Sequence, residues 1–155
     1  MRIHLATDHA GFALKEEIKV WLHTLGYLVS DEGAFVLEAE DDYPEFVQIV
    51  AKQVSANPEE DRGIIFGGSG QGEAITANRF RNVRAAVYYG GDEQIVRLSR
   101  EHNNANILSI GARFVNLERA KEVIKLWLDT EFTGEERHIR RLPKIDTPVP
   151  GTNEF

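Results

Sequence analysis

One glycine-dense stretch, residues 62–80, restricts what this chain can fold into more than any other part of the sequence. It opens with Gly63-Ile64-Ile65-Phe66, a short apolar run that is typical of a buried strand. Residues 67–72 then read Gly-Gly-Ser-Gly-Gln-Gly, and a helical pattern begins at Glu73. Five of the chain's thirteen glycines lie between positions 63 and 72. So many glycines favour a turn that binds a ligand over a tight strand-to-helix connection with no ligand. The stretch therefore predicts a strand, a functional turn and a helix.

The turn could serve either of two chemical purposes. Glycine adopts positive φ and lets a ligand approach the backbone, so several N–H groups can point at one place. The first N–H groups of a helix add partial positive charge. Such a turn could hold a phosphate, or it could stabilise an oxyanion while Glu73 moves a proton. Two familiar glycine motifs are excluded, because residues 68–72 match neither the dinucleotide fingerprint nor the lysine-containing P-loop.

The composition excludes several classes of protein. The chain has 155 residues, 42% of them hydrophobic and 28% charged, which fits one soluble globular domain. No apolar run could span a membrane and the first residues lack a signal-peptide pattern, so we expect a cytoplasmic protein with no membrane partner. A net charge of −7 argues against nucleic-acid binding. The chain has no cysteine, and its five histidines lack metal-ligand spacing, so no metal ion is expected.

The rest of the chain alternates short apolar segments with helical patterns. Strands are expected near residues 3–6, 27–29, 63–66, 84–88 and 107–110. Gly26 stands where a helix would end, and Asp92 and Asn116 are expected helix N-caps. This alternation predicts a doubly wound, Rossmann-like α/β/α sandwich with about five mostly parallel strands. It would occupy residues 1–142, and residues 143–155, with three of the five prolines, would form an extended tail rather than a helix.

The expected fold places the candidate site residues at two edges of the sheet. Ligands of such folds bind at the carboxyl ends of strands. Asp8-His9, the glycine turn and Arg113 each follow a predicted strand, so they should meet at that edge. His102 and Asn103 precede a strand and should lie at the opposite edge. A basic segment, residues 137–144, would be either an anion site or a solvated helix face.

Seven short motifs together resemble one enzyme family. They are Asp8-His9-Ala10-Gly11, Asp42-Tyr43-Pro44, Gly67-Gly68-Ser69-Gly70-Gln71-Gly72-Glu73, Ala77-Asn78, Arg100-Glu101-His102-Asn103-Asn104, Gly111-Ala112-Arg113 and Arg137-His138-x-x-Arg141. In this order and spacing they are similar to the ribose-5-phosphate isomerase B family, whose wider membership includes the galactose-6-phosphate isomerase subunits. The resemblance covers nearly the whole chain except its last residues.

The resemblance implies an enzyme that interconverts ribose 5-phosphate and ribulose 5-phosphate through a cis-enediolate, without metal or cofactor. Glu73 would shuttle the proton between C1 and C2. Another branch of the family uses a cysteine at the position of Gly67, which this cysteine-free chain does not have. His102 would open the furanose ring of the sugar.

The resemblance also implies a set of substrate-binding residues. These are Asp8, His9, Gly68, Ser69, Gly70, Gln71, Gly72, Asn103, Arg113, Arg137 and Arg141. Asp8 would bind sugar hydroxyls and Asn103 the reacting end, while His9 and the arginines would take the phosphate. Arginine suits that task because its planar fork donates two hydrogen bonds to phosphate. Family members are dimers, some pairing to tetramers, with sites built from both subunits, which would bring His102 to the correct edge.

Three alternatives remain open at the level of sequence. The same reaction could act on a tetrose or hexose phosphate, because no motif reports the depth of the pocket. A non-catalytic phosphosugar-binding module could use the same fold. Glu73 argues against that module, since an anion does not help a turn that only holds phosphate. A nucleotide-binding protein is the third alternative, but this chain lacks both glycine fingerprints of that class.

Tyr43, before Pro44, is expected to be a packing residue.

Overall fold

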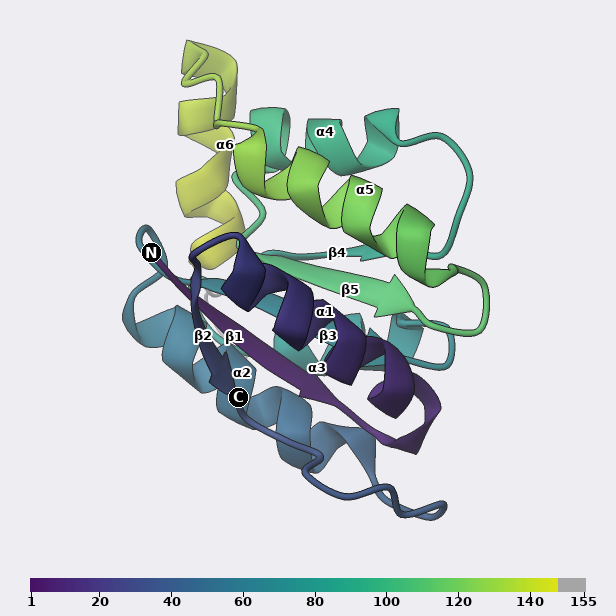
Figure 1. Cartoon of the computed structure of the whole chain (residues 1–155). Coiled ribbons are helices and arrows are strands. Elements are labelled where there is room, and N and C mark those ends of the chain that lie inside the picture. The colour runs from purple at the N-terminus through teal and green to yellow at the C-terminus, as the bar shows by residue number, and fades with distance from the viewer. Residues whose placement is uncertain (148–155) are drawn as a thin grey trace.

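The computed structural model, which describes residues 1–147, has a five-stranded parallel sheet at its centre (Figure 1). The strands are β1 (Arg2–Thr7), β2 (Leu28–Asp31), β3 (Arg62–Gly67), β4 (Ala85–Tyr88) and β5 (Ile107–Gly111). Their order is β2-β1-β3-β5-β4, and every neighbouring pair is parallel. The chain changes its winding direction between β1 and β3, which places a ligand-binding crevice at their carboxyl ends. The predicted fold class is confirmed.

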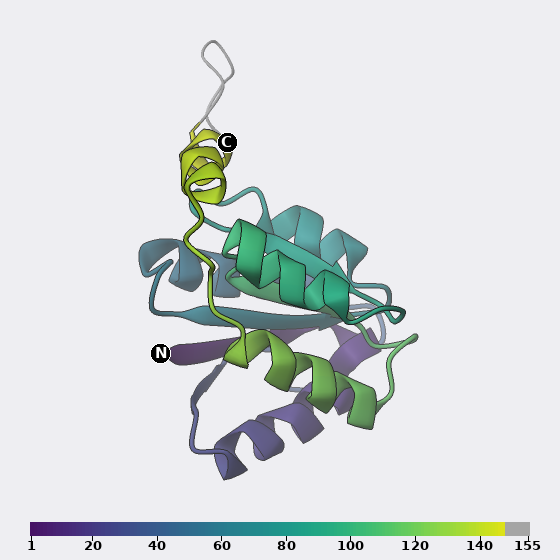
Figure 2. The same cartoon turned by 90° about the horizontal axis from the view of Figure 1, so that it is seen from above.

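Helices cover both faces of the sheet (Figures 1 and 2). One face carries α1 (Phe12–Thr24), α4 (Gln94–Asn103) and α5 (Leu117–Asp129), and the other carries α2 (Tyr43–Ala56) and α3 (Gln71–Ala77). A short 3-10 turn, η1 (His9–Gly11), joins β1 to α1, and α6 (Glu136–Asp146) stands away from both layers. Each helix of residues 1–147 is too short or too polar to cross a membrane.

The core consists of two apolar layers separated by the sheet. Along β3, Ile64 and Phe66 face α1 and α5, while Ile65 faces α2 and α3. Strands buried on both faces read as continuous apolar runs, which explains why this strand was recognisable in the sequence. Trp127 of α5 is fully buried in the first layer, and Val50 of α2 is fully buried in the second. The site therefore rests on a rigid support.

The ends of the helices confirm two expectations and correct two others. The Asn116 side chain accepts the Arg119 N–H at 2.9 Å, and Gly26 follows α1 at φ +82°, both as expected. The N-cap of α4 is Glu93 rather than Asp92, whose carboxylate accepts the Gln94 N–H from outside the helix. The third helix starts at Gln71 instead of position 73, because Gly70 turns the chain at φ +78°. Glycine has no side chain to contribute to a helical pattern of apolar residues, so the sequence indicated only the later residues of this helix.

The expected extended tail is wrong for residues 143–146, because α6 continues through Pro143 to Asp146. Proline inside a helix removes a backbone hydrogen bond and favours a break. Here a tertiary contact holds the last turn, since Arg84 Nη1 lies 2.9 Å from Asp146 Oδ2. The Arg84 side chain is only 7% exposed, so this ion pair is largely shielded from water. Residues 148–155 of the predicted tail lie outside the described residues, and the domain boundary at 142 stays a prediction.

A buried ammonium group fastens the segment that leads from β2 towards α2. The Lys15 side chain is fully buried, and its Nζ donates to Asp31 Oδ1 at 2.6 Å and to the Ala34 carbonyl at 2.8 Å. Burial alone would raise the pKa of Asp31, but hydrogen bonds from Lys15 and Lys19 hold that pKa below its ordinary value. The segment after Ala34 continues to Asp41 and Tyr43, which lie at the carboxyl edge.

We expect Lys15→Met to lower the free energy of unfolding by about 1–3 kcal/mol, because Asp31 and the Ala34 carbonyl each lose a buried donor. Lys19→Met is the matched control. Lys19 binds the same carboxylate from a side chain that is 25% exposed, so its loss should cost less than about 1 kcal/mol. Urea denaturation of both variants measures the difference. Equal losses would mean that the burial of Lys15 gives it no special role.

Candidate functional site

Two neighbouring strand ends bring a pair of carboxyl groups together at the carboxyl edge of the sheet. Asp8 follows β1, and the glycine turn after β3 leads to Glu73 in the first turn of α3. Asp8 is 6% exposed and Glu73 is 4% exposed. Burial raises the pKa of the Glu73 carboxyl; its own backbone N–H opposes this shift, and the charge of Asp8 adds to it. Glu73 is therefore a stronger proton acceptor, when ionised, than a glutamate in water.

The Glu73 carboxylate occupies the space directly beside Gly67. A Cβ atom on Gly67 would lie 1.7 Å from Glu73 Oε1 and 2.0 Å from its Cδ, so no side chain fits at position 67 with Glu73 in this place. The turn itself is held by Ser109, whose buried Oγ donates to the Gly70 carbonyl at 2.7 Å. The carboxylate is thus fixed between the end of β3 and a rigid turn.

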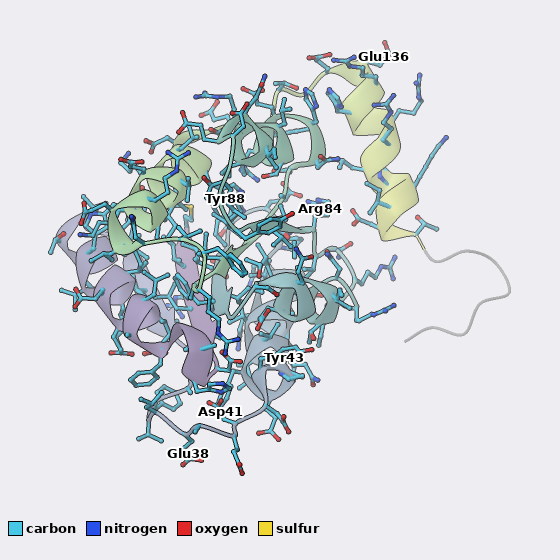
Figure 3. All side chains as sticks on the ribbon, turned by 90° about the vertical axis from the view of Figure 1, so that its right-hand side faces the viewer. Glu38, Asp41, Tyr43, Arg84, Tyr88 and Glu136 are labelled. Atoms are coloured by element: carbon cyan, nitrogen blue, oxygen red, sulfur yellow. The ribbon has the colours of Figure 1, made fainter. Side chains whose placement is uncertain are left out.

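Tyr43, at the start of α2, also reaches the glycine turn. A Cβ atom on Gly72 would lie 2.5 Å from the Tyr43 hydroxyl oxygen, so the phenol covers the first turn of α3 beside Glu73. Figure 3, which faces the carboxyl ends of the strands, shows Tyr43 on this side of the molecule. The sequence interpretation treated Tyr43 as a packing residue. The Tyr43 ring does pack against the core, but its hydroxyl lies within the candidate site.

His9 is held by an aspartate that the sequence interpretation did not select. Asp41 Oδ1 accepts the His9 backbone N–H at 2.9 Å and contacts ring Nδ1 at 2.7 Å. The Asp41 side chain is 8% exposed, whereas that of His9 is 31% exposed. A proton on Nδ1 satisfies this contact and leaves Nε2 as the atom free to meet a ligand. Nothing local signals this pair, because Asp41 lies 32 residues away in an acidic loop.

Asp8, His9 and Asp41 are also the described residues that could hold a cation. Each offers one ligand atom, and these atoms lie within 4.8 Å of one another. The hydrogen bonds between Asp41 and His9 already give two of the three residues a structural reason to be adjacent. We therefore read this cluster as a set of oriented polar side chains.

Arg113 completes the group at the carboxyl edge. It follows β5, and its backbone N–H donates to the Gly68 carbonyl at 3.2 Å. Its guanidinium covers the glycine turn, with Cζ 3.3 Å from the place of a Cβ on Gly68. The structure thus brings together the residues expected at this edge: Asp8, His9, Gly68, Ser69, Gly70, Gln71, Gly72, Glu73 and Arg113.

The other predicted site residues lie at the amino edge of the same chain. His102 and Asn103 end α4, while Arg137 and Arg141 lie on α6, which Figure 1 shows near the amino ends of the strands. Ile107, just after α4, pairs with Gly63 at the start of β3, whereas the glycine turn follows the other end of that strand. Four residues of strand span about 13 Å. One chain therefore does not bring His102 into contact with Glu73.

A buried polar network fixes the chain just after His102. Arg100 donates to Asn104 Oδ1 at 2.8 Å and to the Ala105 carbonyl at 2.6 Å, while Arg84 donates to the Asn104 carbonyl at 3.2 Å. Burial lowers the pKa of the Arg100 guanidinium to about 10, and the nearby charges of Arg62 and Arg84 contribute. These arginines hold the backbone after His102, a role that no local pattern indicated.

The fold and site together define a doubly wound α/β protein with a buried acid–base group at its topological switch point. Residues 3–145 match the family described as Ribose/Galactose Isomerase. The chain belongs to this family, as its motifs predicted.

Relatives of known identity match the chain over nearly its whole length. Ribose-5-phosphate isomerase B of Mycolicibacterium paratuberculosis is 39% identical, over 97% of this chain and 98% of the relative. Its Escherichia coli counterpart is 40% identical over 93% of each chain. The crystal structure of ribose-5-phosphate isomerase B from Mycoplasma genitalium, with bound ribulose-5-phosphate, matches with a TM-score of 0.88 at 38% identity, covering 93% of both chains.

The burial of Glu73 predicts a specific dependence of stability on pH. Because its folded-state pKa is raised, the folded protein loses stability as pH rises from the ordinary glutamate pKa through the raised pKa. Glu73→Gln removes the charge and keeps the shape. We expect the variant to be more stable than wild type above the raised pKa and equally stable below the ordinary pKa.

Calorimetric melting temperatures across acid to mildly alkaline pH measure this difference. Glu17→Gln, at an exposed position of α1, is the control for losing one negative charge. A Glu73→Gln variant that is less stable than wild type at high pH would contradict the burial argument.

Proposed function

We propose that this protein is an aldose–ketose isomerase that interconverts ribose 5-phosphate and ribulose 5-phosphate. The buried Glu73 carboxylate beside Gly67, in a glycine turn at the switch point of the sheet, is the observation that carries the proposal. Relatives named ribose-5-phosphate isomerase B, one of them with ribulose-5-phosphate bound, support the choice of substrate.

Glu73 serves as the base that moves the proton. It removes the proton on C2 of the aldose, and the electron pair forms the double bond of a cis-enediolate. The π electrons of the C1 carbonyl move onto O1, and the hydroxyl proton on O2 passes to O1. The protonated carboxyl then returns the carbon-bound proton to C1, and the electron pair on O2 forms the C2 carbonyl of the ketose. Backbone N–H groups of the turn at residues 68–72 stabilise the negative oxygen of the enediolate. A raised pKa helps because a general base works best when its pKa is near the working pH. The reaction only moves hydrogen within one molecule, so the proposal includes no cofactor.

The remaining residues of the carboxyl edge bind the sugar phosphate. Asp8 accepts hydrogen bonds from sugar hydroxyls, and Arg113 and His9 bind the phosphate. Arg113 already lies over the turn, and Asp41 orients the imidazole of His9. Arginine and imidazole donors match phosphate oxygens in geometry and charge. Family resemblance adds Arg137 and Arg141 for the phosphate and Asn103 for the reacting end.

The separation of the two edges leads us to propose a two-fold homodimer with shared active sites. Proton transfer needs contact through a hydrogen bond or one water, so His102 cannot act at the Glu73 of its own chain. In the dimer, the His102 loop and α6 of one subunit complete the site of its partner. A tetramer of two such dimers is compatible with this arrangement. The cytoplasm, the compartment expected from the sequence, stays a prediction.

Glu73→Gln should fold and bind substrate but lose turnover by ~10²–10⁴-fold, because the general base is gone. The measurement is ketose formation from a panel of tetrose, pentose and hexose aldose phosphates, with and without chelator. The pentose 5-phosphate should be the preferred substrate of wild type. Preference for another chain length would change the substrate and keep the reaction. Turnover of Glu73→Gln within a few-fold of wild type would remove Glu73 as the base.

Mixing two inactive proteins tests the shared site. Glu73→Gln and His102→Ala subunits, exchanged under conditions that allow dimers to re-form, should recover activity, because a heterodimer contains one intact site. Symmetry sets the upper limit at half the wild-type activity per heterodimer. Native mass spectrometry confirms that exchange has occurred. Exchange without recovered activity would show that each site belongs to one chain.

A further inference from the structure

The helix α6 touches the rest of its chain through very few side chains. Among its described residues only His138 is buried, and Ile139 and Ile145 are 54% and 57% exposed. The contact between Arg84 and Asp146 holds its far end. An amphipathic helix normally buries its aliphatic residues first. This one turns a histidine inward and leaves both isoleucines exposed in the single chain, so packing within the chain's own core does not explain it.

The buried side chain of His138 lies flat against the ring of His102. The ring centroids are 4.4 Å apart, and the planes differ by 14°. The His138 side chain is 4% exposed, while His102, in the last turn of α4, is partly buried. A parallel ring at this distance restricts rotation of the His102 imidazole and shields one of its faces from water. The two edge nitrogens of His102 then keep fixed directions.

His138 makes this contact at a cost to its own solvation. Its Nε2 is buried, has no hydrogen-bond partner among the described residues, and lies 3.9 Å from Glu135 Oε2. An unsatisfied buried nitrogen destabilises a fold, so an apolar residue would serve stability better. Burial lowers the pKa of His138, and the charges of His102, Arg137 and Arg141 lower it further. The charge of Glu135 opposes this shift and raises the pKa. These effects favour the neutral form of the ring that faces His102.

We infer that His138 is a positioning residue for His102. Its planar ring holds the His102 imidazole in the orientation that the ring-opening step requires, and α6 is anchored through Arg84 and Asp146 so that this contact persists. The inference rests on the proposed function, because it assumes that His102 acts on the cyclic sugar. It adds a residue that does not itself touch substrate.

Two apolar substitutions distinguish the effect of a planar ring at position 138 from the effect of simply filling its space. His138→Phe keeps a flat ring against His102, and His138→Leu fills the same space without one. Both remove the unsatisfied nitrogen, so both variants should fold and melt at or above the wild-type temperature. His138→Leu should lower turnover of ribose 5-phosphate by about 10- to 100-fold, because a misplaced catalytic group costs about that much. His138→Phe should retain activity within a few-fold of wild type.

Two further measurements exclude a general structural effect. In a His102→Ala background, His138→Leu should cause no additional loss, because the group that it positions is absent. Ring-proton NMR signals of His102 should keep their ring-current shift in His138→Phe and lose it in His138→Leu. Val20→Ala, at an exposed position of α1 outside the proposed site, is the control and should leave turnover unchanged.

The outcomes distinguish this inference from the proposed function. If His102→Ala keeps turnover within a few-fold of wild type, the proposed role of His102 fails. If His102→Ala loses activity while His138→Leu does not, only the positioning role is overturned. It is also overturned if Phe fails to restore activity, or if Leu lowers activity equally without His102.

Discussion

The candidate site depends on a steric exclusion at the end of the central strand. The Glu73 carboxylate is buried next to the backbone of Gly67 in a space that any side chain at position 67 would fill. That position is possible because β3 lies between β1 and β5, so its last residue is buried on both sides. Burial then raises the pKa of Glu73, which suits the side chain to the role of base that we propose for it. The conformation of the turn and the raised pKa of Glu73 thus both depend on close packing at the end of the central strand.

The sequence predicted those parts of the molecule whose signals are local. Apolar strands, a cap at Asn116 and the glycine turn all depend on near neighbours; the cap was placed correctly, and the bounds of the strands and the turn were right to within two residues. The contacts of Asp41 with His9 and of Arg84 with Asp146 were not predicted, since they join residues 32 and 62 positions apart. The second of these carries a helix through Pro143, where local propensity favours a break. Tertiary contacts override propensity at such places.

The proposed site residues are held in different ways at the two edges of the sheet. At the carboxyl edge, short turns hold the acid–base group directly on buried strands, so little can move there. At the amino edge, His102 depends on an arginine network behind it and on a projecting helix beside it. In the proposed dimer, one subunit supplies the firmly held Glu73 to each site. The other subunit supplies His102 and α6, which are packed less firmly.

The clash between position 67 and Glu73 also restricts how such a protein could evolve. A cysteine added at position 67 while Glu73 remains would push the Glu73 carboxylate out of the place that it occupies here. Removing the carboxylate first would remove the base that we propose. A side chain at position 67 and the Glu73 carboxylate therefore cannot both occupy the arrangement described here, so a substitution at either position changes the surroundings of the other.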